Sequence, residues 1–209
     1  MLINNAKLDL AVKKAKTEIE NSGLLARSTR NEIKKSFYPT YIKNNKIKMG
    51  RLSETYLSWW SVNQVSNSWA EITKNDINDP STAFNKSIQR SISLSSGESF
   101  SSRKEEKDML SLIHEMEKTY GKDIRILSGY AVLRLLEEAN FLEELNIHKN
   151  NKIIEDENLD PDQYDPEFLA CAVYSGGFPW SESVSMDKTK EFWNSYIDAG
   201  VLVATAFAS

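Results

Sequence analysis

Apolar residues recur at helical spacing along much of the chain, and the first segment shows the pattern most simply. Apolar side chains stand three or four positions apart from Leu8 to Ile19, and charged side chains fill the positions between them. Gly23 follows, and glycine commonly ends a helix. We therefore expect an amphipathic helix that stops at about Gly23. A shorter helix is expected over residues 28–37, because the residue before Pro39 is disfavoured in the helical region.

The middle of the chain carries two more helical patterns between polar segments. Residues 53–73 are rich in aromatic side chains at helical spacing, so we expect one long helix whose tryptophans lie mostly in the core. Asp79-Pro80 joins a helix N-cap to proline at the first helical position, which predicts a helix through Phe84. We expect a basic loop over 43–50 and a mobile Ser/Gly linker over 95–102.

The second half of the chain predicts a helical hairpin followed by two further helices. The hairpin covers residues 103–121 and 123–145, Asp165-Pro166 opens the next helix, and Ser185 opens the last. No segment alternates apolar and polar residues between hairpin turns, so no sheet is expected. The pattern predicts an all-α fold: a single compact domain over residues 1–209 with seven or eight helices, which could stack as helical hairpins.

Composition fits a folded protein that stays inside the cell. Apolar residues make up 40% and charged residues 27% of the chain, the usual balance of a globular domain. The single cysteine fits a reducing compartment, and the N-terminal residues lack the apolar stretch of a secretory signal. No uncharged run reaches the roughly 20 residues that cross a bilayer. We expect a cytoplasmic protein with no membrane partner.

Few side chains offer catalytic or metal-binding chemistry. His114 lacks a second histidine one helical turn away, and His148 is distant in sequence. Cys171 lies between alanines in an apolar helix, which indicates a buried thiol. The glycine motifs of nucleotide-binding loops and the serine motif of hydrolases are absent. We expect no catalytic residue, no cofactor and no metal, and therefore no enzyme.

Charge is distributed unevenly along the chain. Lys and Arg outnumber Asp and Glu by twelve to four in residues 1–53, whereas they are outnumbered by fifteen to four in residues 137–209. The net charges of the first, middle and last thirds are +8, −1 and −11. Residues 155–167, EDENLDPDQYDPE, hold seven carboxylates and no Lys or Arg. Such segregation points to electrostatic association.

Several interpretations of these charged segments are open. The acidic residues fit a twelve-residue calcium loop from Asp156 to Glu167, except that Pro161 stands where the turn needs glycine. A run of acids can also be a solvated loop with no partner. The basic first third could bind nucleic acid by neutralising phosphates. Equally, it could lie against the acidic third of its own chain.

The last forty-five or so residues carry a family resemblance, which begins at about Leu159. The pattern resembles the C-terminal signature of the immunity-five family, helical immunity proteins of bacterial polymorphic-toxin systems such as contact-dependent growth inhibition. The features that carry it are Asp165 two residues before Glu167-Phe168, Ala170 and Ala172, Gly176-Gly177, Trp180, and Phe192-Trp193 with Tyr196 three residues later.

The resemblance implies an inhibitor that binds the toxin domain encoded beside it, so the expected partner is a cognate toxin. Many such toxins are nucleases with basic clefts, in which a carboxylate-rich loop at 155–164 could take the place of phosphate. Trp180 is either an anchor in this contact or a core residue. The competing interpretation is a helical protein that binds nucleic acid through its basic first third. The expected toxin-binding residues are Glu155, Asp156, Glu157, Asp160, Asp162, Tyr164 and Trp180.

Overall fold

A computed structural model describes residues 5–37, 47–73, 80–95, 103–147 and 165–206. These residues form α-helices and one short 3-10 helix, and no strand occurs among them. The all-α prediction is therefore confirmed, although the described residues hold nine α-helices where seven or eight were expected. In chain order the elements are α1 (Asn5–Ser22), α2 (Arg27–Phe37), α3 (Ile47–Gln64), α4 (Ser66–Thr73), α5 (Pro80–Ser95), α6 (Lys104–Tyr120), η3 (Ile124–Ile126), α7 (Leu127–Ile147), α8 (Pro166–Ser175) and α9 (Met186–Ala206).

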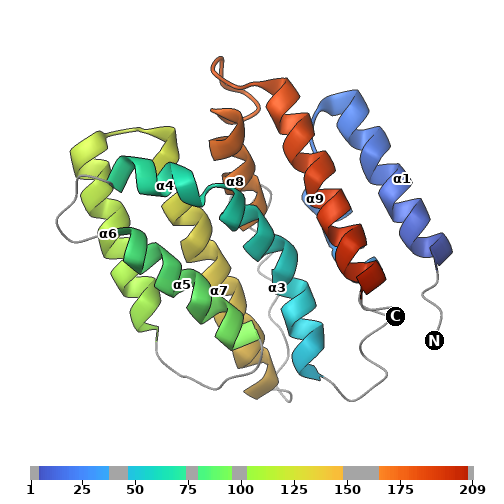
Figure 1. Cartoon of the computed structure of the whole chain (residues 1–209), viewed down its shortest axis with the longest axis horizontal. Coiled ribbons are helices and arrows are strands. Elements are labelled where there is room, and N and C mark those ends of the chain that lie inside the picture. The colour runs from blue at the N-terminus through green and yellow to red at the C-terminus, as the bar shows by residue number, and fades with distance from the viewer. Residues whose placement is uncertain (1–4, 38–46, 74–79, 96–102, 148–164, 207–209) are drawn as a thin grey trace.

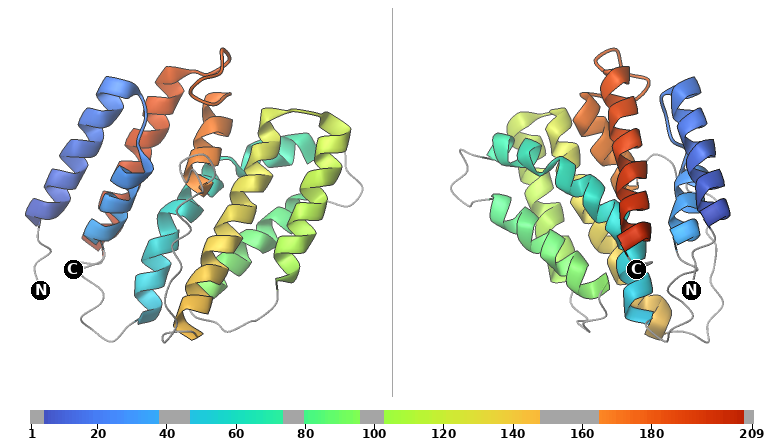
Figure 2. Two further views of the ribbon diagram at one scale, coloured as in Figure 1. Left: turned by 180° about the vertical axis from the view of Figure 1, so that it is seen from behind. Right: turned by 45° about the vertical axis from the view of Figure 1, so that its right-hand side comes forward.

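The helices form two groups that meet at three central helices. At one end of the molecule α1 and α2 pack against α9, and at the other end α4, α5 and α6 pack around α7 (Figures 1 and 2). The helices α3, α7 and α8 lie between these groups, and α8 contacts α3, α7 and α9. The short helix α8 is thus positioned where elements from all parts of the chain converge.

Two hydrophobic clusters fill the interior. The first contains Trp193 and Tyr196 of α9 with apolar residues of α1 and α2. The second contains Trp69 and Phe84, whose rings stack at 5.7 Å between centroids, with apolar residues of α6 and α7. Both clusters draw residues from α3 and α8, and Leu127 packs against both. The core therefore continues from one end of the described structure to the other.

The aromatic segment departs from the prediction of one long helix. A helix begins at Ile47, so part of the expected basic loop over 43–50 is helical. The chain then breaks at Val65 into α3 and α4. At the break the Ser66 hydroxyl donates to the Asn63 carbonyl at 3.0 Å, and Val65 N–H bonds the Val62 carbonyl at 3.1 Å. The serine side chain takes up a backbone acceptor in place of the regular helical bond, which explains the break.

Several helix boundaries follow the local signals that predicted them. Asp165 caps α8, and Gly176 ends it in the left-handed conformation with φ 81°. Asp123 caps the 3-10 helix that precedes α7, a turn that the sequence pattern merged with the helix. Apart from Ser95, which ends α5, the expected linker over 95–102 and the acidic loop over 155–164 lie outside the described residues. Among the described helices, none is both long and apolar enough to cross a membrane.

Candidate functional site

The N-terminus of α8 is fixed by one aspartate that serves two purposes. The Oδ1 atom of Asp165 accepts a hydrogen bond from Phe168 N–H at 2.7 Å, which is the predicted helix cap. Its Oδ2 atom accepts from the guanidinium of Arg30 on α2. Arg30 also donates to the Leu25 carbonyl, and both ionic side chains are almost fully buried. A helix cap and a long-range ion pair therefore share one carboxylate.

A second ion pair lies one turn away. Lys34 of α2 pairs with Glu167 of α8 and also donates to the Ser58 hydroxyl of α3 at 3.1 Å. Ser58 Oγ lies 2.9 Å from carboxylate oxygens of both Glu167 and Glu138 of α7. The Ser58 hydroxyl has one proton, so it can donate to only one of these two carboxyl groups. When Glu138 is protonated, its O–H donates to Ser58 Oγ and Ser58 donates to Glu167, so both contacts are hydrogen bonds. We call Arg30, Lys34, Ser58, Glu138, Asp165 and Glu167 the ionic core.

Burial and neighbouring charges set the protonation of these carboxyls. Burial raises the pKa of Glu138 to about 7, although Lys34 opposes the shift. Burial and the nearby Glu167 carboxylate raise the pKa of Asp165 to about 6. Burial also disfavours the charged form of Glu167, but Lys34 and Arg30 outweigh it and lower its pKa to about 2. Glu167 is thus the permanent anion of the ionic core, and Glu138 is the group that takes up a proton.

The ionic core holds elements of the fold together. Its charged groups bind one another, and α2, α3, α7 and α8 each contribute to it. Glu167, which a calcium loop starting at Asp156 needs as its last ligand, is paired with Lys34. Cys171 is buried, and burial raises the pKa of its thiol to about 12, so it is unreactive as predicted. Within the described residues no three potential ligands cluster as a metal site.

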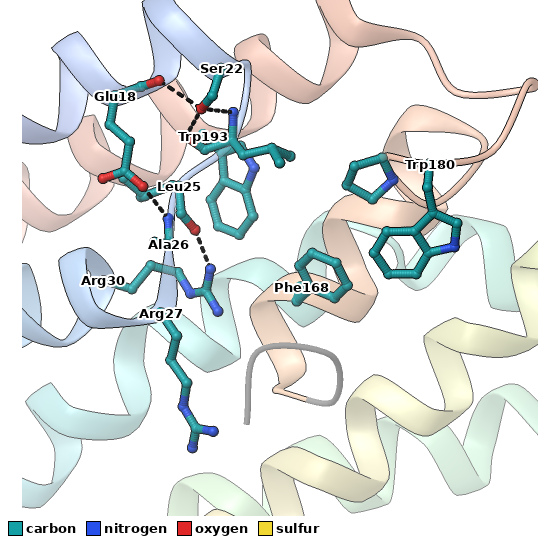
Figure 3. Close-up of a pocket in the computed structure, with 11 residues that line it drawn as sticks. Glu18, Ser22, Leu25, Ala26, Arg27, Arg30, Phe168, Trp180 and Trp193 are labelled. Carbon is teal, nitrogen blue, oxygen red and sulfur yellow. Dashed lines mark hydrogen bonds between the residues drawn. The ribbon is translucent and has the colours of Figure 1, made fainter. Parts of the chain in front are cut away.

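A pocket opens beside the ionic core. Its volume is about 420 Å³, and it lies between the corner that joins α1 to α2 and the start of α8 with the loop that leads to α9. Figure 3 shows Arg30 and Trp193 on one side of this pocket and Phe168 and Trp180 on the other. Arg30 lines the pocket and lies over the Trp193 ring, 5.1 Å from its centroid. The ionic core therefore forms part of the pocket wall.

Trp180 stands at the open edge of this pocket. Its side chain is 65% exposed, so the alternative of a core position is wrong. Its ring is parallel to that of Phe178, with 5.0 Å between centroids, and lies 6.1 Å from the ring of Phe168. The two neighbouring rings hold the indole in place although most of its surface is exposed to solvent. An exposed tryptophan fixed by neighbouring rings is typical of a binding surface.

Comparison with known protein families decides the family of this chain. The family model of immunity protein Imm5 matches residues 12–202. The chain belongs to the Imm5 family. No curated protein matches the sequence. The match covers every residue of the ionic core and of the pocket, so it extends the resemblance of the last forty-five residues to most of the chain. Membership associates the protein with toxin immunity.

The structure of this Imm5 protein locates one of the seven predicted toxin-binding residues. Trp180 lies at the surface, as described above. The acidic segment joins α8 at Asp165, three residues before Phe168, whose ring lies against Trp180. Asp165, the first described residue after that segment, therefore lies at the same corner of the molecule as Trp180. The other six, Glu155, Asp156, Glu157, Asp160, Asp162 and Tyr164, lie outside the described residues.

Sequence reasoning missed the partners of the acids at the start of α8. Arg30 and Lys34 are four residues apart, one helical turn, and Asp165 and Glu167 flank a proline. Nothing in either pattern links the two segments, which are more than 130 residues apart. The available signal was the opposite charge of the first and last thirds. It raised internal pairing as one interpretation, and these two ion pairs confirm that interpretation for the residues involved.

Proposed function

We propose that this Imm5 protein binds and neutralises a cognate toxin domain through an acidic surface centred on Trp180. The observation that carries the proposal is the exposed indole of Trp180, held by the rings of Phe178 and Phe168 in a protein of the immunity family. Tryptophans in such positions often supply much of the energy of a protein interface. The protein acts by occupying its target in the cytoplasm, without catalysis of its own.

Electrostatics explains why the acidic segment belongs to the same surface. Glu155, Asp156, Glu157, Asp160 and Asp162 precede the cap of α8 in a stretch that contains no Lys or Arg. A toxin that cleaves nucleic acid has a basic cleft for phosphates, and carboxylates complement that cleft. The opposite potentials accelerate encounter, and the acids then deny the substrate access to the cleft. Tyr164 and Trp180 add apolar contacts at the edge.

The competing function, nucleic-acid binding by the basic first third, has less support. Arg30 is buried, Lys34 is largely buried, and both are paired with acids at the start of α8. Two exposed lysines of the same hairpin are also paired, Lys14 with Glu32 at 2.8 Å and Lys16 with Asp198 of α9 at 3.5 Å. These cations therefore lie next to carboxylates of the same chain, which reduces their potential toward phosphate.

The test uses the toxin domain encoded by the neighbouring gene. We would purify it with this protein and measure association rates at several salt concentrations. Replacing Glu155, Asp156, Glu157, Asp160 and Asp162 by the corresponding amides should lower the association rate at least tenfold at low salt and flatten its salt dependence. Trp180→Ala should raise the dissociation rate by about tenfold or more. Both variants should melt at the wild-type temperature.

Matched controls come from the opposite end of the molecule. Asp108 and Glu115 are exposed acids of α6, and the variant Asp108→Asn/Glu115→Gln removes carboxylates there. This variant should bind the toxin as the wild type does. Wild-type association rates for the variant that lacks the five acids, together with wild-type affinity for Trp180→Ala, would refute the proposed surface. A salt-sensitive complex with short DNA or RNA in place of the toxin would favour the competing function.

A further inference from the structure

We propose that the loop between α8 and α9 inserts Trp180 into an apolar socket of the toxin domain, and that Glu182 pairs with a Lys or Arg at the rim of that socket. This inference rests on the proposed function and deepens it, because it states what the toxin must present to each of the two side chains. We call residues 176–185 the recognition loop.

The recognition loop projects beyond the two helices that it joins. Figure 1 shows it at the upper edge of the molecule, past the end of α8 and the start of α9. Trp180 on this loop is 65% exposed, and Glu182 and Ser183 are exposed as well. Tryptophans that contribute strongly to an interface usually lie in well-packed, fully desolvated pockets. A projecting indole reaches such surroundings in a concave site, because a flat partner would leave much of its surface in water.

Hydrogen bonds at its base and its tip fix the shape of the recognition loop. At the base, Ser185 N–H donates to the Ser175 carbonyl at 2.9 Å and joins the end of α8 to the start of α9. At the tip, the N–H and the hydroxyl of Ser181 both donate to the Phe178 carbonyl, at 2.8 and 2.6 Å. The Phe178 ring in turn lies parallel to that of Trp180. A loop held in its binding shape loses less conformational freedom when the partner arrives.

Ser183 and Gly177 hold the middle of the recognition loop together. The Ser183 hydroxyl donates to the Gly176 carbonyl at 3.0 Å. A Cβ atom at Gly177 would lie 2.3 Å from Ser181 Oγ and 2.8 Å from Ser183 Oγ, so a larger residue would displace these hydroxyls. Ser183 therefore acts on binding through the loop, as a positioning residue for Trp180.

The charge of the recognition loop favours a basic rim around the socket. Glu182 is the only charged residue of the loop and stands two positions after Trp180. Its carboxylate forms no hydrogen bond or ion pair with the residues that the structure describes. The next charged residue, Asp187 in the first turn of α9, is also acidic, and no Lys or Arg stands between Glu167 and Lys188. A carboxylate that a partner removes from water needs a cation beside it, so Glu182 selects a socket with a Lys or Arg.

The first experiment asks whether the toxin domain covers Trp180. In the protein labelled with 5-fluorotryptophan, the ¹⁹F signal of Trp180 is assigned by its loss in Trp180→Phe. A soluble gadolinium chelate should broaden this signal strongly in the free protein, and most of that broadening should be lost when the toxin domain is added. The signal of the buried Trp69 should stay sharp in both states. Equal broadening of the Trp180 signal with and without bound toxin would overturn the inference.

The second experiment tests the pairing of Glu182. A charge that only attracts the toxin changes the association rate, whereas a paired and desolvated charge changes the dissociation rate. Glu182→Gln should therefore raise the dissociation rate by about fivefold or more, and Glu182→Lys should weaken affinity by about fiftyfold or more. Both variants should melt at the wild-type temperature, because Glu182 is exposed. The matched control Glu115→Lys reverses an exposed charge on α6 and should leave the dissociation rate unchanged.

The third experiment tests Ser183 as a positioning residue. Ser183→Ala removes the hydroxyl that bonds the Gly176 carbonyl. It should shift the ¹⁹F signal of Trp180 in the free protein and weaken toxin binding by about threefold, because the loop is then less ordered before binding. Ser183→Thr keeps a hydroxyl and should restore both the signal and the affinity. A wild-type Trp180 signal with wild-type affinity in Ser183→Ala would contradict the positioning role.

The outcomes separate this inference from the proposed function. If Trp180→Ala weakens toxin binding while both Glu182 variants dissociate at the wild-type rate, the pairing is wrong, although the proposed function stands. If the wild type binds no toxin, the proposed function fails and the toxin is not the partner of the recognition loop. If phosphatidylcholine vesicles protect the Trp180 signal from the chelate and the toxin domain does not, the loop binds a membrane surface, and the inference is wrong.

Discussion

At the scale of single residues, the number of protons bound by the ionic core decides its net charge. Two cations, Arg30 and Lys34, face three carboxyl groups, so full ionisation would leave an excess negative charge in a largely buried site. Such an excess is costly because low-dielectric surroundings do not screen it. A proton on Glu138 removes it, which agrees with a pKa of about 7 for that residue. Glu138 therefore couples folding to pH.

Stability should fall as the pH rises from about 5 to above 7. The pKa values of Glu138 and Asp165 are raised to about 7 and about 6 by folding, so the folded state holds more protons than the unfolded state in this window. Glu138→Gln keeps a neutral group beside Ser58 and removes one titration. We expect a shallower decline and a gain of about 1 kcal/mol at pH 8, a value reduced for the partial exposure of Glu138.

Urea unfolding at pH 5, 6, 7 and 8 measures this effect. The control Glu115→Gln removes an exposed carboxylate on α6 and should follow the wild-type curve throughout. A Glu138→Gln curve with the wild-type slope would show that Glu138 does not change its protonation in this range.

Asp165 and Glu167 show which features of single residues can be predicted from sequence. The cap at Asp165 was predictable because a cap depends on residues within one turn, and Pro166 and Glu167 supply that local signal. The pairing of Asp165 with Arg30 depends on tertiary packing across 135 residues, for which one sequence holds no local signal. The same holds for the pocket beside the ionic core, whose walls come from opposite ends of the chain.

At the scale of elements, the sequence predicted which segments are helical but not where every helix begins and ends. Apolar spacing identifies a helix, and Gly23 and Gly176 mark two ends by their left-handed conformation. The break at Val65 was missed because the aromatic pattern continues across it, with Trp60 before the break and Trp69 after it. The two tryptophans nevertheless pack in different clusters, which the break permits.

Gly129 of α7 shows how closely two of these elements approach. A Cβ atom at Gly129 would lie 2.6 Å from Cζ3 of Trp69 and 2.9 Å from Cγ1 of Ile113. In an exposed helix, Gly→Ala stabilises by about 1 kcal/mol, but crowding a packed core costs about 1–3 kcal/mol. We expect Gly129→Ala to destabilise the protein by about 1–2 kcal/mol in urea unfolding.

A double-mutant cycle checks the cause of that loss. Trp69→Leu removes the ring that the new methyl group would meet, so the combined variant Trp69→Leu/Gly129→Ala should lose less stability than the sum of the single variants. Simple additivity, or a gain of stability in Gly129→Ala alone, would contradict the close approach of α7 to α4.

At the scale of the whole molecule, part of the charge segregation in the sequence is accounted for by ion pairs between the basic and the acidic thirds of the same chain. The basic hairpin of α1 and α2 lies against α9 and reaches α8 through Arg30 and Lys34. The family match to residues 12–202 covers the same elements, whereas the sequence resemblance reached only the last quarter. The earlier helices were not recognisable because amphipathic helices share a pattern that many families use.

The two hydrophobic clusters should unfold together, because α3 and α8 supply residues to both and the ionic core joins α2 to α7. Trp193 reports on the first cluster and Trp69 on the second. In the protein labelled with 5-fluorotryptophan, ¹⁹F signals of both residues should disappear at the same urea concentration.

Glu167→Ala leaves Lys34 without its buried partner and should lower the free energy of unfolding by about 3 kcal/mol. Both midpoints should then fall equally, whereas different midpoints for Trp69 and Trp193 in the wild type would show two independently folding halves.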